Sequence, residues 1–228
     1  MMTENDLIKA ILDNDTIVLN EINPQEYVFN INSDNDTYNY PSRLKEAANA
    51  GYNLVSVKCF EQKISEDEVE FYVNNEQNVF NRMKIYDFLE EASKYKNMYV
   101  IITGVTDNIG KLYDKLSVDY PKLCKITIPV AYSFNDYYTL KRYGTNVPIL
   151  SLDRLGCTKS ELMSFISSND VFACLTSVSD ENVKFNYEFA EVVSKSSDIF
   201  TYADEVNNEA EMIYYRDRYI KGFFTTNK

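Results

Sequence analysis

The sequence of 228 residues contains no histidine. Histidine is the commonest general acid or base at neutral pH and a frequent metal ligand, so its absence removes both. Every catalytic arrangement that pairs serine or cysteine with histidine is therefore excluded. Any enzymatic chemistry would need a site built from other residues, such as carboxylates.

Positive charge and long apolar runs are also scarce. The chain has 23 basic and 35 acidic residues, a net charge of -12 and a pI near 4.6. Nucleic acids and anionic membranes need a basic surface, so we expect neither as a partner. No stretch approaches the roughly 18 apolar residues of a membrane span, and residues 1–6 lack the features of a signal peptide. We expect a cytoplasmic location.

The four cysteines, Cys59, Cys124, Cys157 and Cys174, are widely spaced and form no CxxC pair. Three lie in or beside apolar runs, which is typical of free, buried thiols in a reduced compartment. The chain also lacks a linker rich in proline, glycine or serine, a repeat of fixed period and a low-complexity tract. We therefore expect a single domain over residues 1–228.

What the chain does have is a regular alternation of strand-like and helix-like segments. The strand-like runs are apolar, β-branched or aromatic, and several are nearly continuous, as in parallel strands covered by helices. Eight such runs are predicted, at residues 27–31, 53–59, 98–103, 125–131, 147–152, 171–176, 198–202 and 222–225.

Amphipathic helices are predicted between these strands. In residues 84–95 the apolar side chains recur at helical spacing, and Thr158 followed by Glu161 has the pattern of an N-terminal cap. Eight strands with seven intervening helices indicate the α/β class and a (β/α)8 TIM barrel. A further helix is expected at residues 5–13. The seven helices are predicted at residues 41–50, 84–95, 107–120, 135–143, 159–167, 186–194 and 208–219.

One segment, residues 60–82, breaks the alternation between the second strand and its helix. It is acidic and contains a strand-like stretch at residues 69–73. A loop of this length inside a compact domain is usually functional or a small subdomain. We therefore expect a small insertion after strand 2.

The closing strand resembles that of the glycerophosphodiester phosphodiesterases. Residues 222–226 read Gly-Phe-Phe-Thr-Thr, where that family has Gly-Ile-Ile-Thr-Asp. Residues 51–59 stand in the place of the family's second strand, and residues 128–135 resemble its strand ending in Ser-Phe. Tyr202 takes the place of a family Trp. The resemblance covers about residues 26–227 and implies a barrel with an insertion after strand 2.

The catalytic positions of that family are replaced in this sequence. The family uses two histidines for acid–base work and a divalent cation held by carboxylates. Its Glu and Asp of the second strand become Ser56 and Lys58. The family's His-Arg-Gly is replaced by Asn30-Ile31-Asn32, and its Glu by Tyr38. Its His-Asp is replaced by Val73-Asn74, and its final Asp by Thr226.

These replacements remove the expected metal site. A hard cation needs several oxygen ligands, preferably anionic, and Lys58 instead places an ammonium where the resemblance implies the metal. Two positive charges about 4 Å apart repel by several kcal/mol in a partly buried site. We therefore expect no catalytic residues of the family type, no metal and no cofactor, with the family's Ca or Mg site lost.

The favoured hypothesis is a catalytically inactive barrel that binds a phosphate- or sugar-containing ligand, or a protein partner, at its mouth. Functional residues of such barrels lie where the strands end. The alternative is that these polar groups only satisfy one another and water. The candidate ligand-binding residues are Asn30, Asn32, Ser56, Lys58, Thr103, Ser133 and Thr226.

Two further hypotheses remain open. An interaction surface could use some of the 19 tyrosines, with Tyr137-Tyr138 and Tyr214-Tyr215 on predicted helices; alternatively, one tyrosine of each pair packs on the barrel. A divergent phosphodiester hydrolase could use a relocated, non-histidine site, although aspartates near strand ends are usually caps or loop charges. Its candidate carboxylates are Asp34, Asp36, Asp107, Asp153, Asp180 and Asp204.

Overall fold

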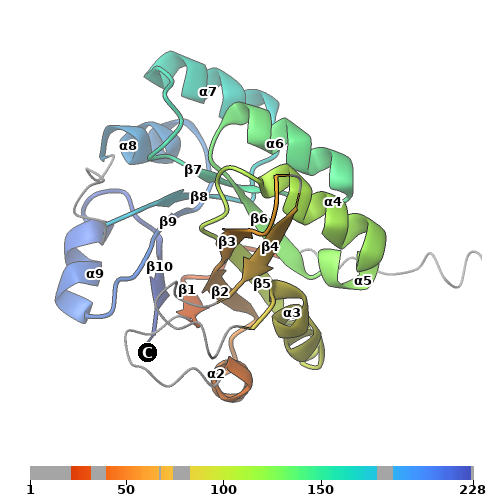
Figure 1. The fold of residues 1–228 in the computed structure, drawn as a ribbon. Coiled ribbons are helices and arrows are strands. Elements are labelled where there is room, and N and C mark those ends of the chain that lie inside the picture. The colour runs from red at the N-terminus through yellow and green to blue at the C-terminus, as the bar shows by residue number, and fades with distance from the viewer. Residues whose placement is uncertain (1–21, 32–39, 67, 74–82, 179–186, 227–228) are drawn as a thin grey trace, which may run out of the picture.

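The structure, a computed structural model, describes residues 22–31, 40–66, 68–73, 83–178 and 187–226. Eight parallel strands close into a barrel in the order β1-β10-β9-β8-β7-β6-β5-β2 (Figure 1). The predicted TIM barrel is confirmed. The barrel strands are β1 (Tyr27–Asn30), β2 (Leu54–Lys58), β5 (Tyr99–Thr103), β6 (Thr127–Ala131), β7 (Ile149–Ser151), β8 (Ala173–Thr176), β9 (Thr201–Ala203) and β10 (Gly222–Thr225).

The strands are apolar on both faces because the barrel has a core inside and another outside. On β2, Leu54 belongs to the cluster inside the barrel, whereas Val55 and Val57 belong to the cluster beneath the helices. Successive strand residues point to opposite faces, so the continuous apolar runs in the sequence serve both clusters.

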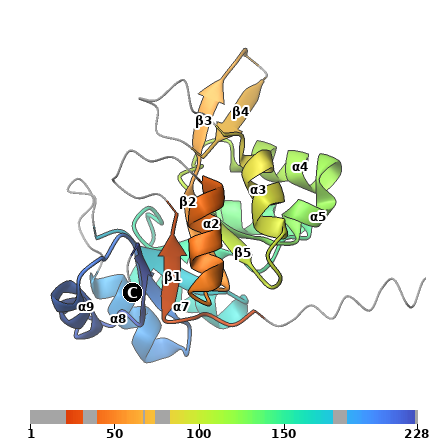
Figure 2. The same cartoon turned by 90° about the horizontal axis from the view of Figure 1, so that it is seen from below.

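Helices cover the outside of the barrel (Figure 2). All seven predicted helices are present, but the segment expected at residues 135–143 divides into α6 and η2, and the short α5 was not predicted. The helix expected at residues 5–13 lies outside the described residues. The helical elements are α2 (Tyr40–Asn49), α3 (Ile85–Ser93), α4 (Ile109–Asp119), α5 (Pro121–Cys124), α6 (Phe134–Leu140), η2 (Lys141–Tyr143), α7 (Lys159–Ser168), α8 (Tyr187–Ser196) and α9 (Glu209–Arg216).

Local signals in the sequence explain several of these boundaries. The Thr158 hydroxyl accepts a hydrogen bond from the Glu161 backbone N–H at 3.2 Å, and the Glu161 carboxylate accepts one from the Thr158 N–H at 2.7 Å, which confirms the predicted cap of α7. All four cysteines are free, as predicted, and only Cys157 is not buried. Within the described part of the chain, no helix is both long and apolar enough to cross a membrane.

Tyr202 fills the end of the barrel where its strands begin. Its hydroxyl donates to the Gln25 carbonyl at 2.7 Å and accepts from the Gln25 N–H at 3.0 Å. Gly222, at the start of β10, leaves room for this ring, because a Cβ there would lie 2.7 Å from Tyr202 Cε1. The glycine that opens the closing strand therefore has a packing role.

The predicted insertion is a hairpin of β3 (Phe60–Lys63) and β4 (Val69–Tyr72), which pair antiparallel and project from the barrel (Figure 2). The strand predicted at residues 69–73 is confirmed as β4. Strand β3 was not predicted, because three of its four residues are polar and none is fully buried. Glu70 joins the hairpin to the helices through Lys84, at 3.2 Å, and Lys115, at 3.7 Å.

Candidate functional site

A cavity of about 420 Å³ opens where the barrel strands end. Its floor includes Leu175 and Phe224, which belong to the apolar cluster inside the barrel. Above that floor, the inward positions of the strands change from apolar to polar residues. A packed barrel with a polar mouth is the arrangement in which TIM barrels place their functional sites.

Four of the seven sequence candidates line this cavity: Asn30, Ser56, Lys58 and Thr103. Strand register brings them together, because Asn30 pairs with Ser56 across β1 and β2, and Lys58 pairs with Thr103 across β2 and β5. The structure therefore gathers these polar side chains on one side of the mouth. Ligand binding by them remains a prediction.

Two of the other three candidates, Ser133 and Thr226, make local hydrogen bonds outside the cavity lining. The Ser133 hydroxyl accepts from the Asp136 N–H at 3.0 Å and caps α6. The Thr226 N–H and hydroxyl donate to Asn207 Oδ1 at 2.8 and 3.0 Å. Neither residue is part of the cavity lining. Asn32 lies outside the described residues.

Ser56 presents a buried hydroxyl to the cavity. Its exposed fraction is 2%, and within the described residues its Oγ has no hydrogen-bond partner. Buried polar atoms nearly always have a partner, and leaving one unsatisfied costs about 1–3 kcal/mol. Ser56 lines the cavity, so the mouth is the place from which a missing partner would come.

Lys58 and Gly104 make close contact on the β2–β5 side. A Cβ on Gly104 would lie 3.1 Å from Lys58 Cγ and 2.5 Å from the Cys59 carbonyl oxygen, so only glycine fits against this part of β2. The Gly104 N–H donates to the Tyr132 hydroxyl at 2.8 Å. Burial raises the pKa of Tyr132 to about 12, so its hydroxyl stays protonated at neutral pH.

Three carboxylates line another part of the mouth, beyond β7 and β9: those of Asp153, Asp204 and Glu205. Asp153 accepts from the Thr176 hydroxyl at 2.8 Å and the Ser177 N–H at 2.6 Å, and Asp204 accepts from the Val178 N–H at 3.0 Å. Burial raises the pKa of Asp204 from its usual 3.8 to about 6, and the nearby charges of Glu205 and Asp153 add to the rise.

Of the other four aspartates considered for a relocated catalytic site, the structure describes only Asp107. Asp107 is exposed before α4 and is not part of the lining. Asp34, Asp36 and Asp180 lie outside the described residues. Of the six aspartates considered, the structure thus shows only Asp153 and Asp204 at the mouth.

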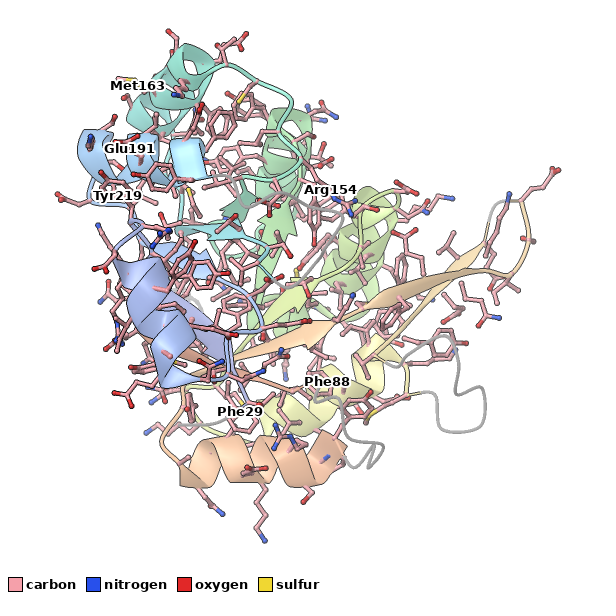
Figure 3. The ribbon with its side chains drawn as sticks, turned by 90° about the vertical axis from the view of Figure 1, so that its left-hand side faces the viewer. Phe29, Phe88, Arg154, Met163, Glu191 and Tyr219 are labelled. Atoms are coloured by element: carbon pink, nitrogen blue, oxygen red, sulfur yellow. The ribbon has the colours of Figure 1, made fainter. Side chains whose placement is uncertain are left out.

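Sequence reasoning missed several lining residues, among them Tyr132, Ser151 and Arg154. The first two follow the two-residue period of inward positions on β6 and β7, which could have found them. Arg154 lies on the side of the barrel from which the hairpin projects (Figure 3). Its guanidinium carbon is 5.6 Å from the centre of the Tyr132 ring, and Arg154 is, with Lys58, one of two basic side chains in the cavity lining.

The residues at the mouth do not fit the Ca or Mg site that the resemblance implies. Ser56 and Lys58 occupy the β2 positions where carboxylates would be expected, and an ammonium repels a divalent cation. Among the described residues, no group of three or more His, Cys, Asp or Glu side chains could hold a metal ion.

The tyrosine pairs on the helices each have one inward member. Tyr137 is fully buried, whereas Tyr138 is 49% exposed. Tyr215 packs against a buried cluster, whereas Tyr214 is 50% exposed and stacks with the Arg218 guanidinium at 3.5 Å. The alternative in which one tyrosine of each pair packs on the barrel is therefore confirmed.

Compared by sequence, the chain matches no protein-family model and no curated protein. Compared by structure, it is similar to a glycerophosphodiester phosphodiesterase from Parabacteroides distasonis, with a TM-score of 0.59, 10% identity and coverage of 88% of this chain and 93% of that one. A glycerophosphodiester phosphodiesterase from Thermotoga maritima gives a TM-score of 0.56 at 15% identity, over 90% of this chain and 96% of that one.

An Oleispira antarctica phosphodiesterase, solved with its product sn-glycerol-3-phosphate, gives a TM-score of 0.58 at 8% identity, over 89% of this chain and 93% of that one. The likeness extends over most of each protein. At these identities it establishes a shared barrel fold with glycerophosphodiester phosphodiesterases, and function has to be argued from the site itself.

Proposed function

We propose that this barrel binds a small phosphate- or sugar-bearing ligand in its mouth cavity without cleaving it. The observation that carries the proposal is the unpartnered, buried hydroxyl of Ser56, which faces a cavity of about 420 Å³. Small-molecule sites are concave, mostly apolar and carry a few convergent polar groups, with volumes of about 300–1,000 Å³. The mouth cavity has a volume in that range and an apolar floor, and most of its other lining residues are polar or charged.

The charges at the mouth suggest how such a ligand would lie. Lys58 and Arg154 can each contact an anionic oxygen, which supports a phosphate despite the net charge of -12 on the chain. Asp153 and Asp204 can accept hydrogen bonds from ligand hydroxyls. A phosphorylated polyol or sugar carries both kinds of group.

Three observations support the absence of catalysis. The chain has no histidine. Ser56 and Lys58 occupy the β2 positions at which the family resemblance implies carboxylates. In the part of the chain that the structure describes, no group of three or more His, Cys, Asp or Glu side chains is arranged to hold a metal ion. Histidine and a bound metal ion, the groups that usually activate water and protonate a leaving group in this family's type of chemistry, are then both lacking.

Isothermal titration calorimetry tests this proposal. The phosphodiesterase from Oleispira antarctica was solved with sn-glycerol-3-phosphate, so this phosphomonoester is the first probe, followed by inorganic phosphate and glycerol. We expect saturable binding of the phosphomonoester that Lys58→Ala weakens by about tenfold or more, because a charge-assisted contact is lost. Lys63→Ala, on the exposed part of the hairpin, is the matched control and should bind like the wild type.

The proposal fails if the wild type does not bind the phosphate probes, or if the Lys58→Ala and Lys63→Ala variants bind equally well. It also fails if the purified protein turns over a glycerophosphodiester.

A second candidate function rests on Asp204 and Asp153. Both carboxylates line the same cavity, and a pKa of about 6 for Asp204 suits a general acid or base near neutral pH. A phosphodiester hydrolase with a relocated site would hydrolyse bis-(p-nitrophenyl) phosphate, and Asp204→Asn would abolish that turnover. Turnover that survives both Asp204→Asn and Asp153→Asn would rule out this site.

A further inference from the structure

The carboxylate of Glu61, on β3, lies at the start of α4. Its Oε1 accepts hydrogen bonds from the backbone N–H groups of Thr106, Asp107 and Asn108 at 3.1, 3.2 and 3.3 Å. Its Oε2 accepts one from the Asn108 side-chain amide at 2.6 Å. Consecutive N–H groups at a helix N-terminus form a nest that favours an anion. Here the anion comes from the hairpin, 45 to 47 residues earlier in the chain.

The segment that Glu61 holds is one wall of the mouth cavity. Thr103, Gly104 and Thr106 all line the cavity. Gly104 has a φ of +89° and approaches the Lys58 side chain so closely that a Cβ would lie 3.1 Å from Lys58 Cγ. A movement of this wall would therefore move the surface against which the Lys58 stem rests.

The wall is held from two sides. The Tyr132 hydroxyl accepts from the Gly104 N–H at 2.8 Å, and the Glu61 carboxylate holds the backbone two to four residues later. The Tyr132 contact comes from the barrel, whereas the Glu61 contact comes from the inserted hairpin. The hairpin thus reaches the candidate site through Glu61, only three residues after Lys58 ends β2.

We propose that Glu61 is a positioning residue for the mouth: by binding the backbone of residues 106–108, it fixes the wall that supports Lys58. The role of Lys58 in this statement rests on the proposed function. Glu61 also fills the nest at α4 with a negative charge. An anionic ligand is therefore directed to the Lys58 ammonium and away from the helix N-terminus.

Glu61→Gln tests this role, with Glu70→Gln as its matched control. Both substitutions remove one negative charge from the hairpin, and both weaken its attachment to the barrel. Glu70, however, contacts Lys84 and Lys115 rather than the mouth wall. Glu61→Asp, which keeps the charge but shortens the side chain, is a second variant in case Glu61→Gln folds poorly.

The first readout needs no ligand. In the ligand-free protein we expect Glu61→Gln to speed hydrogen exchange of the amides of residues 106–108 by about tenfold, because charge-assisted hydrogen bonds become neutral ones. It should also shift the NMR signals of the Lys58 side chain. Glu70→Gln should leave both unchanged. With sn-glycerol-3-phosphate as probe, Glu61→Gln should weaken binding by about tenfold, and Glu70→Gln should not.

The outcomes separate this proposal from the proposed function. Unchanged Lys58 signals and amide exchange in both Glu61 variants, or equal changes in Glu70→Gln, overturn the positioning role. If the wild type does not bind the probe but Glu61→Gln alone shifts the Lys58 signals, the positioning role stands and the ligand-binding proposal fails.

Discussion

Asp153, which follows β7, and Asp204, which follows β9, bind consecutive backbone N–H groups just after β8. Asp153 accepts from the Ser177 N–H at 2.6 Å, and Asp204 accepts from the Val178 N–H at 3.0 Å. The two carboxylates interact electrostatically, and both line the mouth. The backbone that follows β8 is therefore held by carboxylates from the segments after its two neighbouring strands.

The first prediction concerns pH. Because burial raises the Asp204 pKa from 3.8 to about 6, the folded state binds this proton more tightly than the unfolded state. The stability that this group contributes is fully present below pH 3.8 and is lost as the pH rises through about 6. The Asp204→Asn variant cannot ionise at this position and does not undergo the loss. The free energy of unfolding of the variant, relative to that of the wild type, should therefore be greater at pH 7 than at pH 4. Denaturant unfolding at both pH values measures the difference, and a pH-independent difference would contradict the raised pKa.

The second prediction separates binding from stability at Ser56. Ser56→Ala removes a buried hydroxyl that lacks a partner in the described structure, so the free energy of unfolding should be unchanged or rise by up to about 1 kcal/mol. Affinity for sn-glycerol-3-phosphate should fall. Thr201→Val is the control, because its buried hydroxyl also lacks a partner in that part of the chain but lies away from the cavity. Equal affinities in the two variants would contradict the role assigned to Ser56.

The third prediction concerns Gly104. Gly104→Ala should destabilise the protein by about 2–4 kcal/mol, because it combines a strained φ of +89° with a Cβ 2.5 Å from the Cys59 carbonyl oxygen. Gly144→Ala has a φ of +64° and nothing within 4 Å of its Cβ, so it should cost only about 1 kcal/mol. Thermal melts of both variants measure the contrast. Similar losses would mean that the close approach to β2 relaxes easily.

The fourth prediction concerns Tyr202. Tyr202→Phe should cost about 1–3 kcal/mol, because it removes the hydroxyl that bonds both the N–H and the carbonyl of Gln25. Tyr86→Phe is the control, since its buried hydroxyl has no hydrogen-bond partner in the described regions. Chemical denaturation should show Tyr86→Phe as stable as the wild type or slightly more stable. A Tyr86→Phe loss as large as that of Tyr202→Phe would contradict the assignment.

The sequence was sufficient to predict the barrel because both faces of its strands are apolar. Residues such as Val55 and Leu54 pack on opposite sides of the same strand, and the resulting runs stand out from the polar helix surfaces. Strand β3 could not be found in this way. Its polar residues pair with β4 above the barrel, where little apolar surface is buried.

The site was only partly predictable. Ser56 and Lys58 were found because the family resemblance pointed to this strand and because functional residues of such barrels lie where the strands end. Asp204 looked like an ordinary loop charge, and its raised pKa depends on burial that only the assembled mouth provides. Glu61 gave no signal, because its partners at residues 106–108 are backbone groups. Almost every residue type offers a backbone N–H group, so a hydrogen bond to the backbone leaves no recognisable pattern in the sequence.

The pairing of β1 with β10 also has a consequence for biosynthesis. Tyr27 pairs with Phe223, about 200 residues later, so the barrel cannot close until β10 has left the ribosome. Until then, one edge of β1 and one edge of β9 remain open, and unpaired edges invite pairing with other chains. Closure over so long a loop is slow. The nascent chain should therefore depend on chaperones until β10 has emerged and paired with β1.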